Sequence, residues 1–180
     1  MEFSTLGREK VYTGRAFDVE LVHFRLPDGK QRSFDLVNHT DSITILPLDR
    51  MGNILFVKQY RVGVGGLLLE LPAGMIEAGE EPRECAEREI REETGMGAGR
   101  LELLGDFYLA PGYDSEHMYV YLATDLYPEP LTQDVDEFLQ VEAIPAAQSV
   151  DMAQSGQIHD SKTLASLMLA LPKLKSWLER

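Results

Sequence analysis

Alternating polarity dominates the first part of the chain. Residues 10–26 place apolar side chains at roughly every second position, which predicts a strand. The Pro-Asp-Gly-Lys sequence at 27–30 is a strong turn signal, and a second strand is predicted at 31–37. We therefore expect residues 1–40 to form an N-terminal β-hairpin unit, and we assign residues 41–180 to the main domain.

Beyond residue 40, short apolar runs alternate with turn residues, and three segments have the pattern of helices. Strands are predicted at 42–48, 53–60, 67–71, 101–109, 116–126 and 138–144. Helices are predicted at 82–94, 145–155 and 161–179. This order predicts an α/β (α+β) domain in which helices cover the faces of a mixed sheet. A length of 180 residues suits one such domain with a full core.

The helix predicted at 82–94 carries acidic residues on the side that should pack. Pro82 suits a first helical position, and Gly95 suits the position after the helix. At about 100° per residue, Glu89 and Glu93 share a face with the small residues of the helix. An ordinary amphipathic helix, the alternative interpretation, would place these acids on its solvated face. A hard divalent cation, which prefers carboxylate oxygens, explains the arrangement better.

Residues 74–96 read GMIEAGEEPRECAEREIREETGM. They fit the pattern G-x5-E-x7-R-E-U-x-E-E-x-G-U, where U is a bulky apolar residue, at every fixed position. This is the Nudix box, so the chain resembles Nudix hydrolases, which cleave a nucleoside diphosphate linked to another group. The resemblance implies an α/β/α sandwich with a loop–helix–loop that binds Mg²⁺ or Mn²⁺.

The resemblance also implies roles for individual residues around the box. Glu89 and Glu93 are the expected direct metal ligands, and Glu92 is a further ligand or a neighbour of one. Arg88 is expected to orient a glutamate, and the backbone carbonyl of Ala73 is expected to complete the metal site.

The sequence leaves the general base open. In some Nudix enzymes the base is a box glutamate, which here is Glu93. In ADP-ribose-type relatives it often comes from a late loop, here residues 132–138. Glu137 is the best match in that loop, with Asp136 and Asp134 as alternatives.

Three features outside the box resemble the ADP-ribose pyrophosphatase branch of the family. They are Gln-Tyr-Arg at 59–61, Pro111 sixteen residues after the last box glycine, and the tail at 156–170. The implied reaction converts ADP-ribose and water to AMP and ribose 5-phosphate. Branches that cleave GDP-mannose, ADP-glucose, NADH or FAD share much of this pattern. A nucleotide-binding module without turnover is a further alternative, although such a module could dispense with the box carboxylates.

Substrate contacts are expected close to the predicted metal site. Arg61 could hold a phosphate through its planar guanidinium, and Pro111 occupies the position typical of the branch. Glu70 could contact the substrate or brace Arg88. Glu80, another box position, is a candidate ligand for a second metal ion.

Composition limits the partners and the compartment. A net charge of −13 argues against nucleic acid and anionic membranes as main partners. An acidic protein that handles a diphosphate needs local cations, which the metal and Arg61, with Arg15 or Arg25, could supply. One cysteine, Cys85, cannot form an intrachain disulfide and is expected to be buried. Since no apolar run has signal-peptide or membrane-span length, we expect a cytoplasmic protein. The resemblance implies a homodimer in which the N-terminal unit completes the partner's active site; the alternative is a hairpin that packs on its own core.

Overall fold

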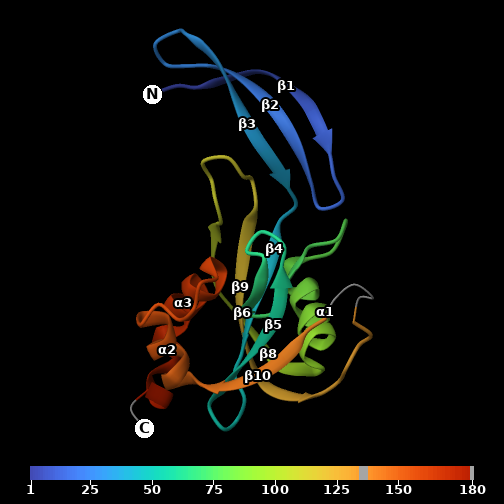
Figure 1. Cartoon of the computed structure of the whole chain (residues 1–180), viewed down its shortest axis with the longest axis vertical. Helices are drawn as coiled ribbons and strands as arrows, with labels where there is room; N and C mark the ends of the chain where they lie inside the picture. Colours follow the sequence, from blue (N-terminus) through green and yellow to red (C-terminus); the bar gives the residue numbers. More distant parts are fainter. Residues whose placement is uncertain (134–137, 179–180) are drawn as a thin grey trace. The chain divides into compact units, whose positions relative to one another are not determined.

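The computed structural model describes residues 1–133 and 138–178, which form two compact units (Figure 1). The first unit contains residues 1–41 together with 107–117, and the second contains residues 42–106 with the described residues from 118 onward. The boundary expected after residue 40 had not placed residues 107–117 with the N-terminal strands.

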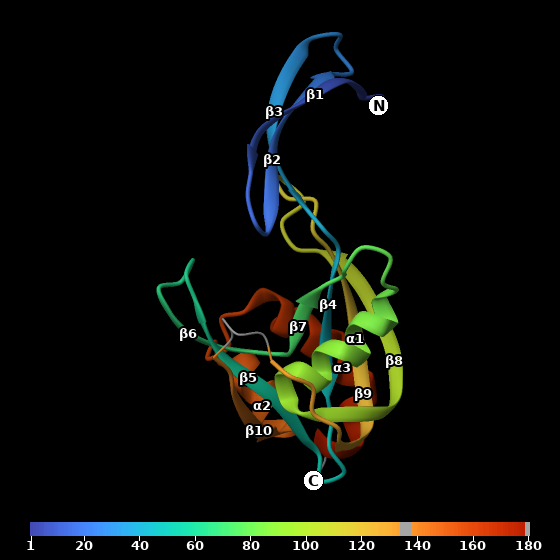
Figure 2. The same cartoon turned by 90° about the vertical axis from the view of Figure 1, so that its right-hand side faces the viewer.

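The first unit is built on an antiparallel three-stranded meander in the order β1-β2-β3 (Figure 2). Its strands are β1 (Ser4–Thr13), β2 (Phe17–Arg25) and β3 (Gln31–His39). The prediction of one strand over 10–26 was wrong, because the chain reverses directly after β1. The Gly14 N–H donates to the Phe17 carbonyl at 3.0 Å, and a Cβ on Gly14 would lie 2.9 Å from the same oxygen. Glycine therefore permits a turn that the alternating polarity on both sides conceals.

The second unit contains two sheets, ordered β7-β4-β9-β8 and β10-β5-β6. Their strands are β4 (Ser42–Pro47), β5 (Asn53–Arg61), β6 (Gly66–Glu70), β7 (Ala73–Met75), β8 (Met96–Tyr108), β9 (His117–Pro128) and β10 (Gln140–Pro145). β4 runs parallel to β9 and antiparallel to β7, which confirms the predicted mixed sheet. All six residues of β4 are buried, so this strand forms the centre of the unit.

Helices cover both faces of these sheets. Within this unit, α1 (Pro82–Thr94) lies on one side, and α2 (Ala146–Gln154) and α3 (Ser161–Leu178) lie on the other (Figure 1). Apolar side chains fill a core on each side: Ile43 and Ile45 pack with residues of α1, whereas Leu46 packs with residues of α3. This is the predicted sandwich. Among the described helices, none is long and apolar enough to cross a membrane.

The bounds of α1 match the prediction from its terminal residues. Pro82 occupies the first turn, and the Glu84 carboxylate accepts the Glu81 N–H at 3.1 Å. At the other end Gly95 adopts a φ of 71° and donates its N–H to the Arg91 carbonyl at 3.1 Å. The helix is therefore fixed at both ends, which sets the register of its acidic residues against the sheet.

Candidate active site

The loop before α1 makes close contact with the acidic face of the helix. Gly74 lies so near Glu89 that an added Cβ would sit 1.8 Å from Glu89 Oε1. One residue earlier, the Ala73 N–H donates to Glu93 Oε2 at 3.1 Å. The loop itself is held by β4, because the Ile45 N–H donates to the Pro72 carbonyl at 2.9 Å. Loop and helix therefore approach each other closely at Gly74.

The acidic face of α1 is the packed face, as predicted. Glu89 is 9% exposed and Glu93 is 2% exposed, so their carboxylates lie mostly out of solvent. Cys85, Ala86 and Ile90, on the same helix, are completely buried. Like charges one helical turn apart repel by roughly 0.2–0.5 kcal/mol even in water, and burial adds a desolvation cost. The buried acidic face therefore destabilises the fold unless cations compensate its negative charge.

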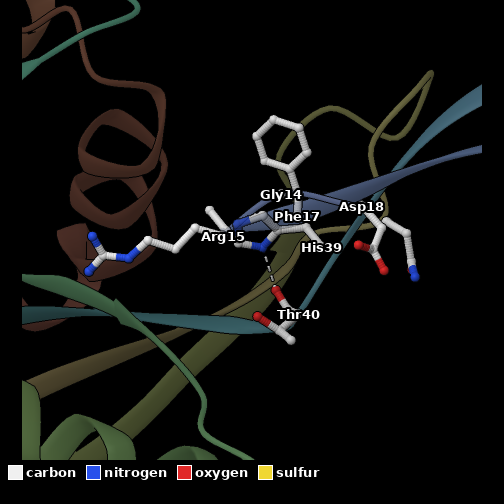
Figure 3. A pocket seen from close by; sticks show the side chains of 8 residues that line it. Gly14, Arg15, Phe17, Asp18, His39 and Thr40 are labelled. Atoms are coloured by element: carbon white, nitrogen blue, oxygen red, sulfur yellow. Dashed lines mark hydrogen bonds between the residues drawn. The ribbon is translucent and has the colours of Figure 1, made fainter. Parts of the chain in front are cut away.

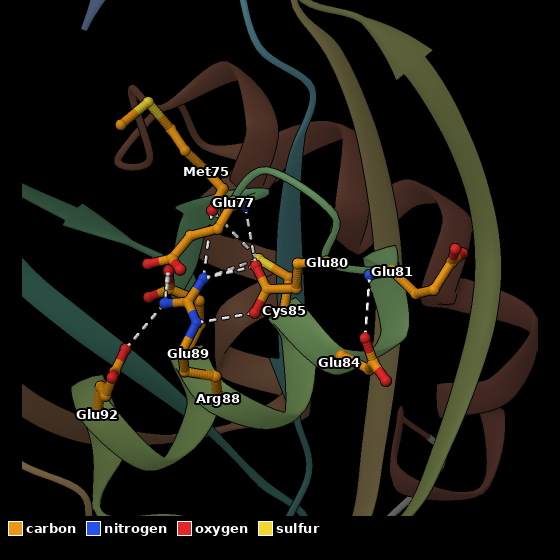
Figure 4. A network of polar contacts seen from close by, with 9 residues as sticks. All are labelled: Met75, Glu77, Glu80, Glu81, Glu84, Cys85, Arg88, Glu89 and Glu92. Atoms are coloured by element: carbon orange, nitrogen blue, oxygen red, sulfur yellow. Dashed lines mark hydrogen bonds and ion pairs between the residues drawn. The ribbon is translucent and has the colours of Figure 1, made fainter. Parts of the chain in front are cut away.

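Arg88 is the cation at the centre of this acidic face (Figure 4). Its Nη1 donates to Glu89 Oε1 at 2.6 Å and to Glu92 Oε2 at 3.0 Å. Its Nε and Nη2 donate to the two carboxylate oxygens of Glu80 at 2.9 and 3.0 Å, and Nη2 also reaches the Met75 carbonyl at 3.2 Å. One guanidinium thus fixes three carboxylates relative to the loop.

The bond between Arg88 and Glu80 is the main electrostatic feature of this network. Hydrogen bonding to Glu80 is the largest cause that raises the pKa of Arg88, and the same bond lowers the pKa of Glu80. Glu80 Oε2 also accepts the Glu77 N–H at 2.9 Å. The structure therefore shows Glu80 as a brace for Arg88, and its expected part in a second metal site stays a prediction.

Arg61 and Glu70 form a second ion pair in this unit. Arg61 Nε and Nη2 donate to Glu70 Oε1 and Oε2 at 2.8 and 2.7 Å, a bidentate arrangement. The Glu70 side chain is 1% exposed, whereas the Arg61 side chain is 43% exposed. On this side the hydrogen-bond partner of Glu70 is Arg61. The alternative that Glu70 braces Arg88 stays a prediction.

Charges around the Arg61 guanidinium show its relation to the acidic helix. The pKa of Arg61 is raised, chiefly by its hydrogen bonds to Glu70 and further by the charge of Glu93. Because burial alone would lower that pKa, the raised value reflects the surrounding carboxylates. Arg61 thus lies within the electrostatic reach of the face that carries Glu93.

Three residues at or just before the start of α3 join this pair, and the sequence alone indicated no role for them. Lys162 donates to Glu70 Oε2 and lies 3.0 Å from Asp160 Oδ2. Asp160 accepts the Thr163 N–H at 2.9 Å, and Thr163 Oγ1 accepts the Leu71 N–H at 2.8 Å. An aspartate before a predicted helix is a typical cap, so Asp160 had a local signal. The contacts of Lys162 with Glu70 and of Thr163 with Leu71, each between residues 92 positions apart, had no such signal.

Comparison with known proteins places this architecture in a family. Residues 38–167 match the sequence model of the NUDIX domain, which is more than half of the chain. The chain belongs to the Nudix family.

Relatives cover nearly the whole of this Nudix protein. ADP-ribose pyrophosphatase of Bacillus subtilis (strain 168) is 33% identical over 165 residues, 91% of this chain and 89% of the relative. GDP-mannose pyrophosphatase of Pectobacterium atrosepticum is 30% identical over 155 residues, 79% of this chain and 78% of the relative. A crystal structure of an ADP compounds hydrolase superposes with a TM-score of 0.88 at 30% identity, covering 98% of this chain and 96% of that one.

Nudix hydrolases generally need a divalent metal, and the oxygen donors on α1 fit such an ion. Glu89 and Glu93 are buried carboxylates on one helix face, and Gly74 leaves the loop backbone directly beside Glu89. Hard cations prefer such oxygen ligands. Within residues 1–133 and 138–178, no three acidic, histidine or cysteine side chains converge into a complete metal cluster. Backbone carbonyls such as that of Ala73, and the substrate, would have to supply further oxygens.

Pro111 belongs to the first unit of this Nudix protein. It lines an open pocket together with Asp41, Tyr108, Asp114, Ser115 and His117. The Tyr108 and His117 rings lie 4.7 Å apart between centroids, at an interplanar angle of 32°. This pair offers an aromatic surface beside Pro111, whose contact with substrate stays a prediction.

A separate pocket in the first unit contains Arg15, one of the cations considered for diphosphate binding (Figure 3). The pocket is lined by the turn after β1 and by the end of β3, where His39 Nδ1 lies 2.7 Å from the Thr40 carbonyl oxygen. Arg25, the other cation considered, ends β2 and is exposed. Either residue as a phosphate ligand stays a prediction.

Two further sequence predictions concern Cys85 and the general base. Cys85 is completely buried, as predicted, and burial is the largest cause that raises the pKa of its thiol. Its Sγ donates to the Met75 carbonyl at 3.4 Å. Glu137, with its alternatives Asp134 and Asp136, lies outside the described residues. The structure therefore leaves the choice between Glu93 and Glu137 as it stood.

Proposed function

We propose that this Nudix enzyme hydrolyses the diphosphate linkage of ADP-ribose to AMP and ribose 5-phosphate, with Mg²⁺ as its cofactor and Mn²⁺ as a substitute. The observation that carries the proposal is the buried acidic face of α1, on which Arg88 fixes Glu89 and Glu92 beside a loop where Gly74 leaves room for the Glu89 carboxylate. The names of the B. subtilis relative and of the superposed hydrolase support the choice of an ADP compound.

The residues of α1 would hold the cation. Glu89 and Glu93 are the proposed ligands, with Glu92 and the carbonyl of Ala73 beside them. When bound, a divalent ion neutralises phosphate oxygens and makes a water easier to deprotonate. Arg88 keeps Glu89 and Glu92 in fixed orientations, which limits the reorganisation that binding requires.

Arg61 is the proposed protein ligand of the diphosphate. A guanidinium has five N–H donors, and Arg61 uses its Nε and Nη2 on Glu70. The remaining donors lie on the edge of a side chain that is 43% exposed, so they suit a phosphate oxygen. Glu70 orients the guanidinium from inside and, with 1% exposure, would act on the substrate through Arg61.

We keep two candidates for the general base. Glu93 lies on the acidic face with one oxygen bonded to the Ala73 N–H, which would direct its second oxygen toward the cation or a water. Glu137 is the best match to the late-loop base of ADP-ribose-type relatives. Since a base must reach the proton it removes, separate Glu93→Gln and Glu137→Gln variants distinguish the two through the pH dependence of kcat.

GDP-mannose is the second candidate substrate, because a relative named GDP-mannose pyrophosphatase is 30% identical to this chain. The residues proposed above address the metal and the diphosphate, which both compounds share. Parallel hydrolysis of ADP-ribose, GDP-mannose, ADP-glucose, NADH and FAD ranks the base and sugar preference directly.

We further propose that the enzyme is a cytoplasmic homodimer. The three-stranded sheet of the first unit buries very few of its side chains, and large apolar residues such as Val11, Phe17 and Phe34 are exposed on it. A second copy of the chain would remove this apolar surface from water. The single cysteine fits a reducing compartment.

The test is product analysis of ADP-ribose incubated with Mg²⁺, comparing the wild type with Glu93→Gln. We expect AMP and ribose 5-phosphate from the wild type and a loss of at least a hundredfold in kcat for the variant. Glu87→Gln is the matched control, because Glu87 lies on the exposed side of α1 and pairs with Arg83. Turnover of GDP-mannose but not ADP-ribose would overturn the substrate; no turnover of any of these compounds would overturn the function.

A further inference from the structure

The start of α3 buries a lysine that the proposed chemistry does not use. The Lys162 side chain is 9% exposed, Asp160 is 11% exposed and Glu70 is 1% exposed. Replacing buried ion pairs by apolar residues of similar volume often leaves a protein equally stable or more stable. Together with Arg61, these residues form a network of four charged side chains. A contribution to stability alone is therefore a weak explanation for the network.

The Glu70 carboxylate is shared between two cations from different elements. Oε2 accepts from Arg61 Nη2 at 2.7 Å and also from Lys162, while Oε1 accepts from Arg61 Nε. Lys162 thus approaches from α3 inside the fold, and Arg61 approaches from the end of β5 with its other donors nearer the solvent. Because the Glu70 carboxylate lies between Lys162 and Arg61, its position sets the position of the Arg61 guanidinium.

The same helix start also holds the chain next to Glu70. Thr163 Oγ1 accepts the Leu71 N–H at 2.8 Å and donates to Asp160 Oδ2 at 2.6 Å. Leu71 follows Glu70 directly and leads into the loop that carries Ala73. One turn of α3 thereby fixes both the carboxylate that orients Arg61 and the backbone that leads to the acidic helix.

We propose that Lys162 is a positioning residue for the substrate diphosphate, acting through the shared carboxylate of Glu70 on the Arg61 guanidinium. The inference rests on the proposed function only in taking a diphosphate as the group that Arg61 binds. With Lys162 present, two positive and two negative charges balance in this network. Without it the network has a net negative charge, and Arg61 alone compensates the buried carboxylate.

Loss of Lys162 therefore has two consequences for an anionic substrate. The guanidinium is drawn toward Glu70, which withdraws its outer donors from the diphosphate. The field around Arg61 also becomes more negative by one charge, which disfavours a diphosphate further. Both effects weaken substrate binding, whereas neither removes an oxygen donor from the acidic face of α1.

The experiment compares Lys162→Met and Lys162→Arg with the wild type in three measurements. They are the KM and kcat for ADP-ribose, calorimetric binding of ADP-ribose and GDP-mannose without metal, and Mn²⁺ binding without nucleotide. We expect Lys162→Met to raise KM about tenfold and to weaken metal-free nucleotide binding equally, with Mn²⁺ affinity unchanged. Lys162→Arg, which keeps the charge, should recover most of the loss.

Controls separate a positioning role from a purely structural one. Lys173→Met removes another paired lysine of α3, the partner of Glu102, and should leave every measurement unchanged. In an Arg61→Lys background, Lys162→Met should add little further loss, because the fork through which it acts is already absent. If Lys162→Met does not fold, Lys162→Gln, which removes the charge but keeps a hydrogen-bond donor toward Glu70, replaces it, with the same expected loss of about tenfold.

The outcomes also separate this inference from the proposed function. A wild type that binds ADP-ribose without cleaving it overturns the function, and the binding data for Lys162→Met still decide the inference. Unchanged nucleotide binding in Lys162→Met overturns the inference. So does a double variant, Arg61→Lys with Lys162→Met, whose loss of nucleotide affinity equals the product of the two single losses. A wild type that binds neither nucleotide without metal also overturns it.

Discussion

Gly74 is the residue on which the geometry of the acidic face depends most directly. A methyl group at this position would occupy the space of the Glu89 carboxylate, with a separation of 1.8 Å from Oε1. Either the carboxylate or the loop must move, and both carry proposed metal ligands. We expect Gly74→Ala to weaken Mn²⁺ binding at least tenfold and to lower kcat, because displaced ligands no longer match the ion.

A matched glycine provides the control for this prediction. Gly63 lies between β5 and β6, and nothing lies within 4 Å of a Cβ built on it. Gly63→Ala should therefore retain both activity and Mn²⁺ affinity. Equal metal affinity for Gly74→Ala and the wild type, measured by titration calorimetry, would contradict the assignment of Glu89 as a ligand.

Residue spacing predicted the acidic face of α1 but not its full set of contacts. The i, i+4 relation of Glu89 and Glu93 is local, so the sequence alone indicated that they share a packed face with Arg88 beside it. The hydrogen bonds from Arg61 to Glu70 and from Lys162 to Glu70 depend on how β5, β6 and α3 pack. The Lys162–Glu70 pair joins residues 92 positions apart, and sequence spacing contains no signal for such long-range pairing.

At the scale of elements, the junction of β6 and α3 depends on an ionised carboxylate. Burial raises the pKa of Glu70, but hydrogen bonds and charges of Arg61 and Lys162 more than offset this, so the pKa lies below its ordinary value of 4.5. A carboxyl with a lowered pKa in the folded state stabilises the fold above its ordinary pKa. That contribution is lost as the pH falls through the lower, folded value.

We therefore expect the difference in the free energy of unfolding between the wild type and Glu70→Gln to depend on pH. The difference should be largest near neutral pH and should shrink as the pH falls from about 4.5 through the lower pKa of the folded state, because the carboxyl binds a proton first in the unfolded chain and then in the folded one. Urea titrations at several pH values measure it. Glu142→Gln, which removes an exposed partner of Lys58, should show no such trend; a constant difference for Glu70→Gln would contradict the ion-pair account.

Element boundaries were predictable where a residue with restricted backbone angles marks them. Pro82 and Gly95 gave the bounds of α1, since each suits one end of a helix. The start of β8 at Met96 was missed, because its first residues include Gly97 and Gly99, which resemble a loop. The three residues of β7 are too few to produce a periodic pattern, so the sequence indicates them only as part of the loop before α1.

At the scale of the whole molecule, the three-stranded sheet of the first unit exposes several large apolar side chains. Val11 is 56% exposed and Phe34 is 50% exposed. If a second copy covers this surface, light scattering should give about twice the chain mass of 20.2 kDa. A Val11→Lys/Phe34→Lys variant should dissociate at least tenfold more readily, because each lysine places a charge in an apolar interface.

The control for the dimer prediction is Glu9→Lys, which adds the same residue type at an exposed, already charged position of β1. It should leave the mass unchanged. A wild-type mass of one chain at micromolar concentration would contradict the homodimer. The sequence could not decide this point, because the alternation of apolar and polar residues in β1–β3 is the same whether a sheet covers itself or a partner.

The single cysteine can report whether α1 is packed against the sheet. Cys85 lies completely buried between the helix and the sheet, and burial keeps its thiol protonated and unreactive. An alkylating reagent can reach it only when the helix separates from the core. The labelling rate therefore measures how often the acidic face opens, without any engineered probe. A ligand that tightens this face must slow the reaction, so thiol labelling would detect occupancy of the site even for a compound that is never cleaved.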